Sequence, residues 1–143
     1  RQGWRYHMSN LMAAIGVEQL KKFPILARKR QLLATTYTEY LKNISEIILM
    51  DLDYNDIVPH IFVIKVLSDR RNELKEFLKN KKIETGIHYK PNHLLKYFRD
   101  DTSVCLPITE KVYNQILTLP LHPDLSIEDV IYVSESIKEF FKI

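Results

Sequence analysis

The pattern of apolar residues predicts a helix near the start of the chain. From Leu11 to Leu20 apolar side chains recur at roughly helical spacing. Ser9 or Asn10 can cap this helix, because either side chain can accept a hydrogen bond from a first-turn N–H. The sequence therefore predicts that the helix begins close to residue 11.

Pro24 divides the predicted helical region in two. Proline lacks the N–H that would bond one turn back, so we expect an interruption at Phe23. A second helix then follows from about residue 24 to residue 42, and together the two form a long, kinked arm. The positions of the second helix that we expect to be buried are Leu26, Leu33, Tyr37, Tyr40 and Leu41.

After residue 42 the pattern changes to short apolar runs between amphipathic segments. Runs rich in β-branched and aromatic residues predict strands at 45–50, 61–67, 83–89 and 116–119. Helices are predicted at 69–82, 108–115 and 126–142, and residues 91–101 as a loop or short helix. In the last helix, Ser126 and Asp129 resemble a capping box. The residues expected to face inward there are Val130, Val133, Ile137 and Phe140.

This order of elements predicts an α+β fold. We expect the long kinked N-terminal helical arm to be followed by a small, mainly antiparallel sheet with helices packed on one face. The change of pattern divides the chain into residues 1–42, a linker segment with long helices, and residues 43–143, a small C-terminal domain.

Composition excludes several classes of protein. The chain has 143 residues, of which 45% are hydrophobic and 27% charged, as in an ordinary globular domain. Cys105, the only cysteine, rules out a disulfide scaffold and is expected to be a small core residue. The three glycines are too far apart for a dinucleotide fingerprint or a phosphate-binding loop. No apolar run is long enough to span a membrane. A lone thiol and no export signal favour the cytoplasm, and the opening at Arg1 rather than Met indicates a trimmed or partial chain.

Positive charge is concentrated at the start of the chain. Residues 1–42 carry eight Lys and Arg against two Glu, whereas residues 43–143 carry a net charge of −3. A basic segment of this kind could meet nucleic acid, an acidic membrane surface or a single phosphate group, or it could be a solvated helix face.

Two polar clusters could carry chemistry. Residues 3–10 (GWRYHMSN) precede a helix N-terminus, where N–H groups and the helix dipole favour an anion. Residues 86–93 (GIHYKPNH) end a predicted strand and could line the mouth of a pocket. The alternatives are a basic helix start and a polar loop. A metal site is not expected, because Pro91 prevents helical spacing of His88 and His93 and no cysteine pair accompanies them.

The chain resembles the C-terminal part of the DegT/DnrJ/StrS family of sugar aminotransferases. The resemblance covers residues 3–141 and is carried by five blocks in order: GWRYHMSNLMAAIGVEQL, HIFVIKV, KKIETGIHYKPNH, LPITEKVYNQILTLPLHP and the closing amphipathic helix. It implies a pyridoxal-phosphate enzyme of the aspartate-aminotransferase fold. It also implies that the Schiff-base lysine lies upstream in a large domain, so that this chain alone is inactive.

The resemblance implies roles for both polar clusters. Residues 3–7 would reach across a homodimer, so that Arg5 and His7, with Asn10, would bind the cofactor phosphate of the partner. Tyr6, His88, Tyr89 and His93 would border the substrate pocket. The implied substrates are a nucleotide-diphosphate sugar, as in polysaccharide or O-antigen biosynthesis, and glutamate; no nucleic acid, membrane or metal is implied.

Two other functions stay open. The rival is a small basic α+β module that binds nucleic acid or a protein through residues 1–42. Against it, the strand IFVIKVL has only one aromatic residue and one lysine, unlike an RNA-binding strand. The other is a family member that acts as a sugar dehydratase or a regulator, which depends on the residue at the lysine position.

Overall fold

The alternating apolar residues in the middle of the chain form a three-stranded sheet in the order β1–β2–β3. The computed structural model describes residues 6–98 and 104–143. Its strands are β1 (Ile47–Leu49), β2 (Phe62–Val66) and β3 (Ile116–Leu119), and its helices are α1 (Asn10–Leu41), α2 (Arg71–Asn80), α3 (Pro107–Gln115) and α4 (Ile127–Phe141). Two single 3-10 turns, Asn92–Leu94 and Lys96–Phe98, precede α3. The predicted α+β class and the long N-terminal helix are confirmed.

Both strand pairs of the sheet are antiparallel, and their register places the apolar residues on one face. Ile64 of β2 lies opposite Leu49 of β1 and Leu117 of β3, and Phe62 lies opposite Leu119. Phe62, Ile64, Leu117 and Leu119 are almost completely buried. Because side chains alternate between the two faces of a strand, this register fixes which face the helices cover.

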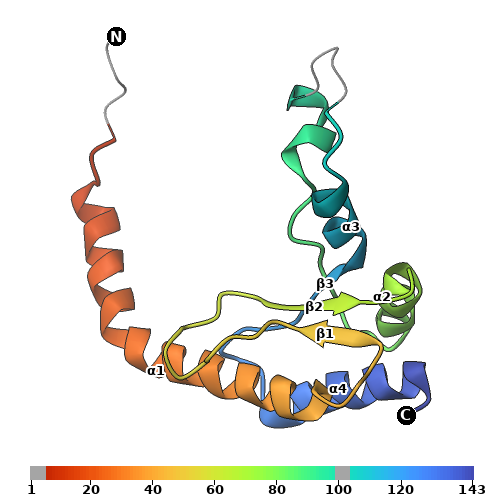
Figure 1. Ribbon diagram of the computed structural model, residues 1–143. Coiled ribbons are helices and arrows are strands. Elements are labelled where there is room, and N and C mark those ends of the chain that lie inside the picture. The colour runs from red at the N-terminus through yellow and green to blue at the C-terminus, as the bar shows by residue number, and fades with distance from the viewer. Residues whose placement is uncertain (1–5, 99–103) are drawn as a thin grey trace.

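Helix α1 is one continuous helix rather than two. Ser9, not Asn10, is its cap: the Ser9 hydroxyl accepts a hydrogen bond from the Met12 N–H, and Asn10 is the first helical residue. Pro24 lies inside the helix, which changes direction in its neighbourhood (Figure 1). The expected break at Phe23 is therefore wrong and the expected kink is right, because neighbouring turns keep their hydrogen bonds when one N–H is missing.

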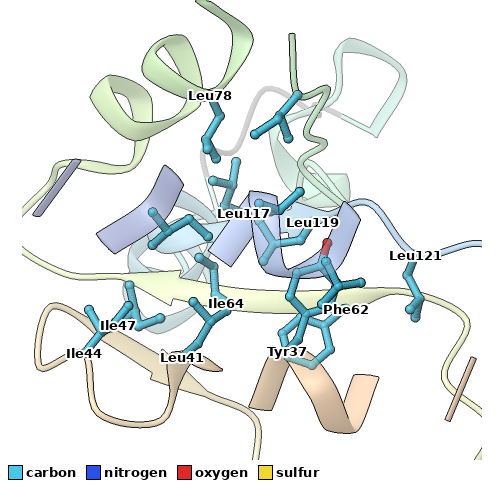
Figure 2. Close-up of a cluster of buried hydrophobic side chains, with 14 of the residues drawn as sticks. Tyr37, Leu41, Ile44, Ile47, Phe62, Ile64, Leu78, Leu117, Leu119 and Leu121 are labelled. Atoms are coloured by element: carbon cyan, nitrogen blue, oxygen red, sulfur yellow. The ribbon is translucent and has the colours of Figure 1, made fainter. Parts of the chain in front are cut away.

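The helices form a layer on the apolar face of the sheet. The second half of α1 lies beside α4 in Figure 1, and α2 packs against α4 and β3. Figure 2 shows the resulting core, in which the Tyr37 ring stacks on Phe62 with a centroid separation of 4.8 Å. Of the positions expected to be buried in α1, Leu33, Tyr37 and Leu41 are buried, whereas Leu26 and Tyr40 are only half-buried.

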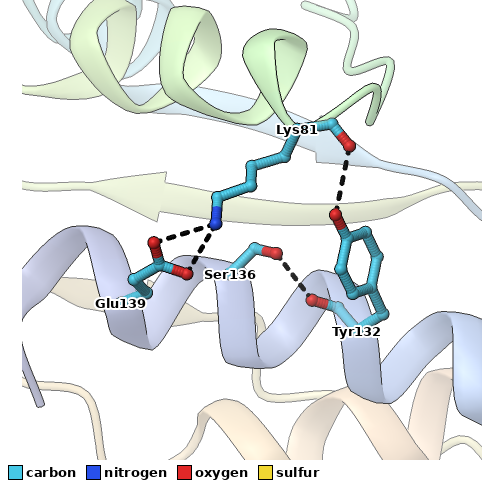
Figure 3. Close-up of polar contacts among 4 residues, drawn as sticks. All are labelled: Lys81, Tyr132, Ser136 and Glu139. Atoms are coloured by element: carbon cyan, nitrogen blue, oxygen red, sulfur yellow. Dashed lines mark hydrogen bonds and ion pairs between the residues drawn. The ribbon is translucent and has the colours of Figure 1, made fainter.

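Contacts between α2 and α4 fix the edge of this layer (Figure 3). Lys81, which follows α2, donates to both carboxylate oxygens of Glu139 at 2.8 Å, and this bond raises the pKa of the Lys81 ammonium. The Tyr132 hydroxyl donates to the Lys81 carbonyl at 3.3 Å. At the start of α4 the predicted capping box is confirmed, since Ser126 and Asp129 exchange side-chain-to-backbone hydrogen bonds. Of the residues expected to face inward in α4, Val130, Val133 and Ile137 are buried, and Phe140 is half-buried against the core.

The predicted strand 83–89 is wrong. In that segment Gly86 alone forms a bridge, to Thr118 of β3. Two residues further on, the His88 side chain also contacts Thr118, through a hydrogen bond between Nδ1 and the threonine hydroxyl. The composition of the run predicted a strand, but only one of its residues pairs with the sheet.

Two parts of the chain project from the core (Figure 1). One is the first half of α1, where Leu11, Ile15 and Leu20 are each more than half exposed. The other is the arm that ends in α3. Cys105 lies on this second arm and is exposed, so the expectation of a core cysteine is wrong. Its apolar neighbours Val104 and Leu106 are also exposed, because the segment lies beyond the sheet.

Candidate functional site

Gly86 holds the second polar cluster, residues 86–93, against β3. Its N–H donates to the Thr118 carbonyl at 3.0 Å, and its carbonyl accepts from the Thr118 N–H at 2.8 Å. A Cβ placed on Gly86 would lie 2.3 Å from Cε1 of His88. Only glycine leaves room for the imidazole here, since a residue without a side chain permits close approach.

The His88 imidazole is fixed by a hydrogen bond between Nδ1 and the Thr118 hydroxyl, 3.0 Å apart. Thr118 is buried, whereas His88 is exposed. The ring of Tyr89 meets the imidazole edge-on, with centroids 4.9 Å apart, and Tyr89 is 73% exposed. The structure thus brings His88 and Tyr89 together at the surface, with the Nε2 edge of the imidazole left for an outside partner.

His93 points toward α3. Its Nε2 lies 3.0 Å from Oε1 of Glu110, and its side chain is only 12% exposed. The same Glu110 oxygen accepts the Leu106 N–H at 3.0 Å and so caps the start of α3. The backbone bond from Leu106, and then the bond to His93, lower the pKa of the Glu110 carboxyl. His93 therefore ties residues 86–93 to α3, and the substrate contact predicted for it remains a prediction.

A shallow, mostly apolar groove of about 320 Å³ lies between Tyr89 and α3. It is lined by Tyr89, Pro91, Ile108, Thr109, Val112, Tyr113 and Ile116. Behind it lies Arg71, which is buried and donates to the Ile116 carbonyl at 3.2 Å. The Arg71 guanidinium also lies 5.7 Å from the centre of the Tyr113 ring. A groove with apolar walls and tyrosine and threonine hydroxyl groups, next to the His88 imidazole that contacts Tyr89, suits a flat, oxygen-rich ligand.

The first polar cluster, residues 3–10, lies at the start of α1, on the other projecting part of the chain. Arg5 falls outside the described residues. Tyr6 is 87% exposed, and His7 and Asn10 are exposed at the start of α1. Figure 1 shows this end of α1 and the α3 arm as separate projections, so one chain does not bring the two clusters together.

The start of α1 fits a phosphate group. Its first turn holds no acidic residue, and within residues 6–98 and 104–143 the N–H groups of Asn10 and Leu11 have no hydrogen-bond partner. Unpaired N–H groups and the helix dipole favour an anion, and the His7 ring and the Asn10 amide add side-chain donors. The donors present therefore match the phosphate end of a cofactor.

Metal ligands are not gathered in this part of the molecule. Within residues 6–98 and 104–143, no three His, Cys, Asp or Glu side chains lie close enough together to hold a metal ion. Nor is any helix in those two ranges both long and apolar enough to cross a membrane.

The fold belongs to a known class of enzyme. The chain is a member of the DegT/DnrJ/EryC1/StrS aminotransferase family, whose model matches residues 1–138. This confirms the resemblance drawn from the five sequence blocks. The family's cofactor is pyridoxal phosphate, since matching structures hold it or its amino form.

Individual relatives show how much of such a protein this chain represents. It is 30% identical to an uncharacterized protein of Methanocaldococcus jannaschii, MJ1066, over 96% of this chain and 38% of the relative. It is similar to NtdA of Bacillus subtilis, solved with bound PMP, at 32% identity and a TM-score of 0.85, over 95% of this chain and 33% of NtdA. It is also similar to the PLP form of Spr1654 from Streptococcus pneumoniae, at 25% identity and a TM-score of 0.79, over 95% and 36% of the two chains. The chain thus spans little more than a third of its relatives' length.

Sequence reasoning missed two residues that build the site, Thr118 and Glu110. Glu110 carried a signal: it is the fourth residue of the run Pro107–Glu110, and a proline in the first turn of a helix followed by an acidic residue is typical of a helix start. Thr118 carried no such signal. Its role depends on pairing with Gly86, and 31 residues separate the two in the sequence.

Proposed function

We propose that this chain is the C-terminal part of a pyridoxal-phosphate-dependent nucleotide-sugar aminotransferase. The complete enzyme would move an amino group from glutamate to a keto sugar that is attached to a nucleotide diphosphate. The observation that carries the proposal is the family match over residues 1–138. We further propose that the cofactor-binding lysine lies outside these 143 residues, in a large domain, so that the chain alone does not transaminate.

The two polar clusters would serve the two ends of the reaction site. At the start of α1, Arg5, His7 and Asn10 would hold the cofactor phosphate, because guanidinium, imidazole and amide groups all donate to phosphate oxygens. When bound, pyridoxal phosphate supplies the electron sink for amino transfer. The residues of this chain would set the position of the cofactor and of the sugar rather than carry out the covalent steps.

At the second cluster, Nε2 of His88 and the hydroxyl of Tyr89 would donate hydrogen bonds to oxygens of the nucleotide-sugar. Tyr89 lines the groove beside α3, and the His88 ring contacts Tyr89 edge-on. The apolar walls of the groove would cover one face of a sugar or base ring. From the start of α1 of a second chain, Tyr6 would approach the same pocket. His93, whose ring contacts Glu110, would border the pocket on the side of α3.

The separation of the clusters supports a homodimer. One chain places them on different projections, so a site that uses both needs a second chain or a large structural change (Figure 1). The first two turns of α1, residues 11–17, are apolar on every side, and Leu11, Met12, Ile15 and Val17 are exposed. A helix that is apolar all round is normally enclosed by protein. We propose that it packs within the complete dimer and delivers Arg5 and His7 to the partner's cofactor.

Subunit mixing tests this proposal. In the complete protein, Arg5→Ala should lose pyridoxal phosphate on dialysis while keeping its fold, since a charge-assisted bond contributes about 1.5–3 kcal/mol. Arg5→Ala subunits are then mixed with subunits that lack the cofactor-binding lysine. One site of the mixed dimer combines an intact lysine with the intact Arg5 of its neighbour, so part of the activity should return.

The matched control is Lys21→Ala, a change of equal charge on an exposed, ion-paired side chain of α1. It should retain the cofactor. If activity does not return although subunit exchange is demonstrated, Arg5 serves its own subunit or does not contact phosphate, and the dimeric arrangement is wrong.

A further inference from the structure

We infer that Thr118 is a positioning residue: its hydroxyl donates to Nδ1 of His88 and holds the imidazole in the tautomer that presents Nε2–H beside Tyr89, a residue that lines the groove. The inference deepens the proposed function and rests on it for the claim that the sugar substrate meets this edge of His88. It identifies Thr118 as the residue that orients the imidazole and makes Nε2 a hydrogen-bond donor.

The direction of the hydrogen bond follows from the partners that each group has. The Thr118 Oγ1 atom lies 3.0 Å from His88 Nδ1, and no other partner for this hydroxyl occurs in residues 6–98 and 104–143. If Nδ1 carried the proton, the buried hydroxyl would have no acceptor for its own hydrogen. Leaving a buried donor unpaired is costly, so the arrangement in which the hydroxyl donates is favoured. Nδ1 then carries no proton, and Nε2 carries one.

The position of the ring is fixed from a second side by Gly86. Both backbone hydrogen bonds of Gly86 go to Thr118, which places the glycine directly across from the hydroxyl that holds His88. The imidazole lies over the space where a side chain at residue 86 would be, only 2.3 Å from an added Cβ. Tyr89 closes the third side with its edge-on ring contact. The ring is therefore bounded on three sides, and Nε2 is the nitrogen left for a ligand.

This arrangement defines the chemistry of the contact. A neutral imidazole with Nε2–H is a hydrogen-bond donor and not a base at that atom, so it suits an acceptor such as a phosphate or sugar oxygen. Without Thr118 the two tautomers would exchange and the ring would turn. In part of the molecules an unprotonated ring nitrogen would then face the substrate oxygen, and two acceptors form no hydrogen bond. We expect weaker binding of the sugar substrate and unchanged binding of glutamate.

The tautomer can be measured directly by nitrogen NMR on the 143-residue chain. The chain is labelled with ¹⁵N-histidine and measured at a pH about two units above the ordinary histidine pKa of ~6.5. His88 should then show an unprotonated Nδ1 and a protonated Nε2. The His88 signals are assigned by their loss in His88→Ala. Thr118→Val should produce a mixture of tautomers, and Thr118→Ser should restore the wild-type pattern. A protonated Nδ1 in the wild-type chain would overturn the inference without any variant.

Kinetics in the complete protein test the consequence. Thr118→Val should raise KM for the nucleotide-sugar by about three- to tenfold, the loss expected for one neutral hydrogen bond, and leave KM for glutamate unchanged. Thr118→Ser should lie close to wild type, and Gly86→Ala should resemble Thr118→Val. The matched control is Thr36→Val, which removes a buried threonine hydroxyl from α1, far from His88.

Failure of this inference and failure of the proposed function give different results. If His88→Ala raises KM for the sugar but Thr118→Val changes neither KM nor the tautomer, Thr118 does not position His88. If Thr118→Val shifts the tautomer but neither variant changes KM, His88 does not contact the sugar, and the substrate part of the inference is overturned.

Discussion

Tyr37 offers a test of how β3, the strand that carries Thr118, is held to the helical layer. The residue is completely buried in the core (Figure 2). Its hydroxyl donates to the carbonyl of Pro120, just after β3, at 3.0 Å. Tyr37→Phe removes this donor and keeps the ring that stacks on Phe62. Within the described ranges the Pro120 carbonyl accepts no other hydrogen bond, so the substitution leaves it unsatisfied.

The size of the effect follows from that lost partner. A buried acceptor without a hydrogen bond costs about 1–3 kcal/mol, and Pro120 is half-buried, so we expect a loss of about 1–2 kcal/mol in the free energy of unfolding. Urea unfolding followed by circular dichroism measures it. With a slope m of about 2 kcal/mol/M, the midpoint should fall by about 0.5–1 M at unchanged m.

Tyr132→Phe is the matched control. The Tyr132 hydroxyl also donates to a carbonyl, that of Lys81, but at 3.3 Å and from a residue that is 52% exposed (Figure 3). Water can replace this bond, so we expect a change within about 0.5 kcal/mol. If Tyr37→Phe costs no more than Tyr132→Phe, the hydroxyl of Tyr37 does not hold β3 to the helices.

Four further predictions follow from the structure. Burial, and then the charge of Asp129, raise the pKa of Tyr37, so the protein should lose stability as the pH rises above the unfolded tyrosine pKa of ~10. Burial also raises the pKa of Tyr54, so Tyr37→Phe should reduce this loss in urea titrations without abolishing it, and an unchanged loss would contradict the prediction. The Leu106 N–H, and then the His93 ring, lower the pKa of the Glu110 carboxyl, so the stability that this carboxylate contributes is present above its unfolded pKa of ~4.3 and is lost as the pH falls. Glu110→Gln should flatten this dependence in urea titrations, and an unchanged slope would contradict the role of Glu110 as the cap of α3. Ser126→Ala should cost about 1 kcal/mol, or about 3 °C in Tm, by removing the cap of α4, and an unchanged Tm would contradict it. Finally, borohydride reduction of the chain mixed with pyridoxal phosphate should label lysines only in scattered, substoichiometric amounts, and mass spectrometry that finds one fully modified lysine would place the cofactor-binding residue in this chain.

The sequence determined the type of most elements, because their signals are local. The β-branched run around Ile64 gave a strand, the spacing of Leu74 and Leu78 gave an amphipathic helix, and the pair Ser126 and Asp129 gave a helix start. Each depends on residues within one or two turns of one another, so their backbone preferences and the burial of one face agree. The family, too, could be recognised from ordered blocks of residues before any fold was known.

The tertiary structure decided the features that depend on residues far apart in the chain. Pro24 could break or bend α1, and the turns on either side kept the helix continuous. The segment around Gly86 had the composition of a strand, yet it pairs with β3 at one residue, and His88 also contacts Thr118. That contact joins positions 30 residues apart, and neither residue carries a local signal for it. The sequence therefore identified which polar residues could form a site, whereas long-range packing decided which way the imidazole faces.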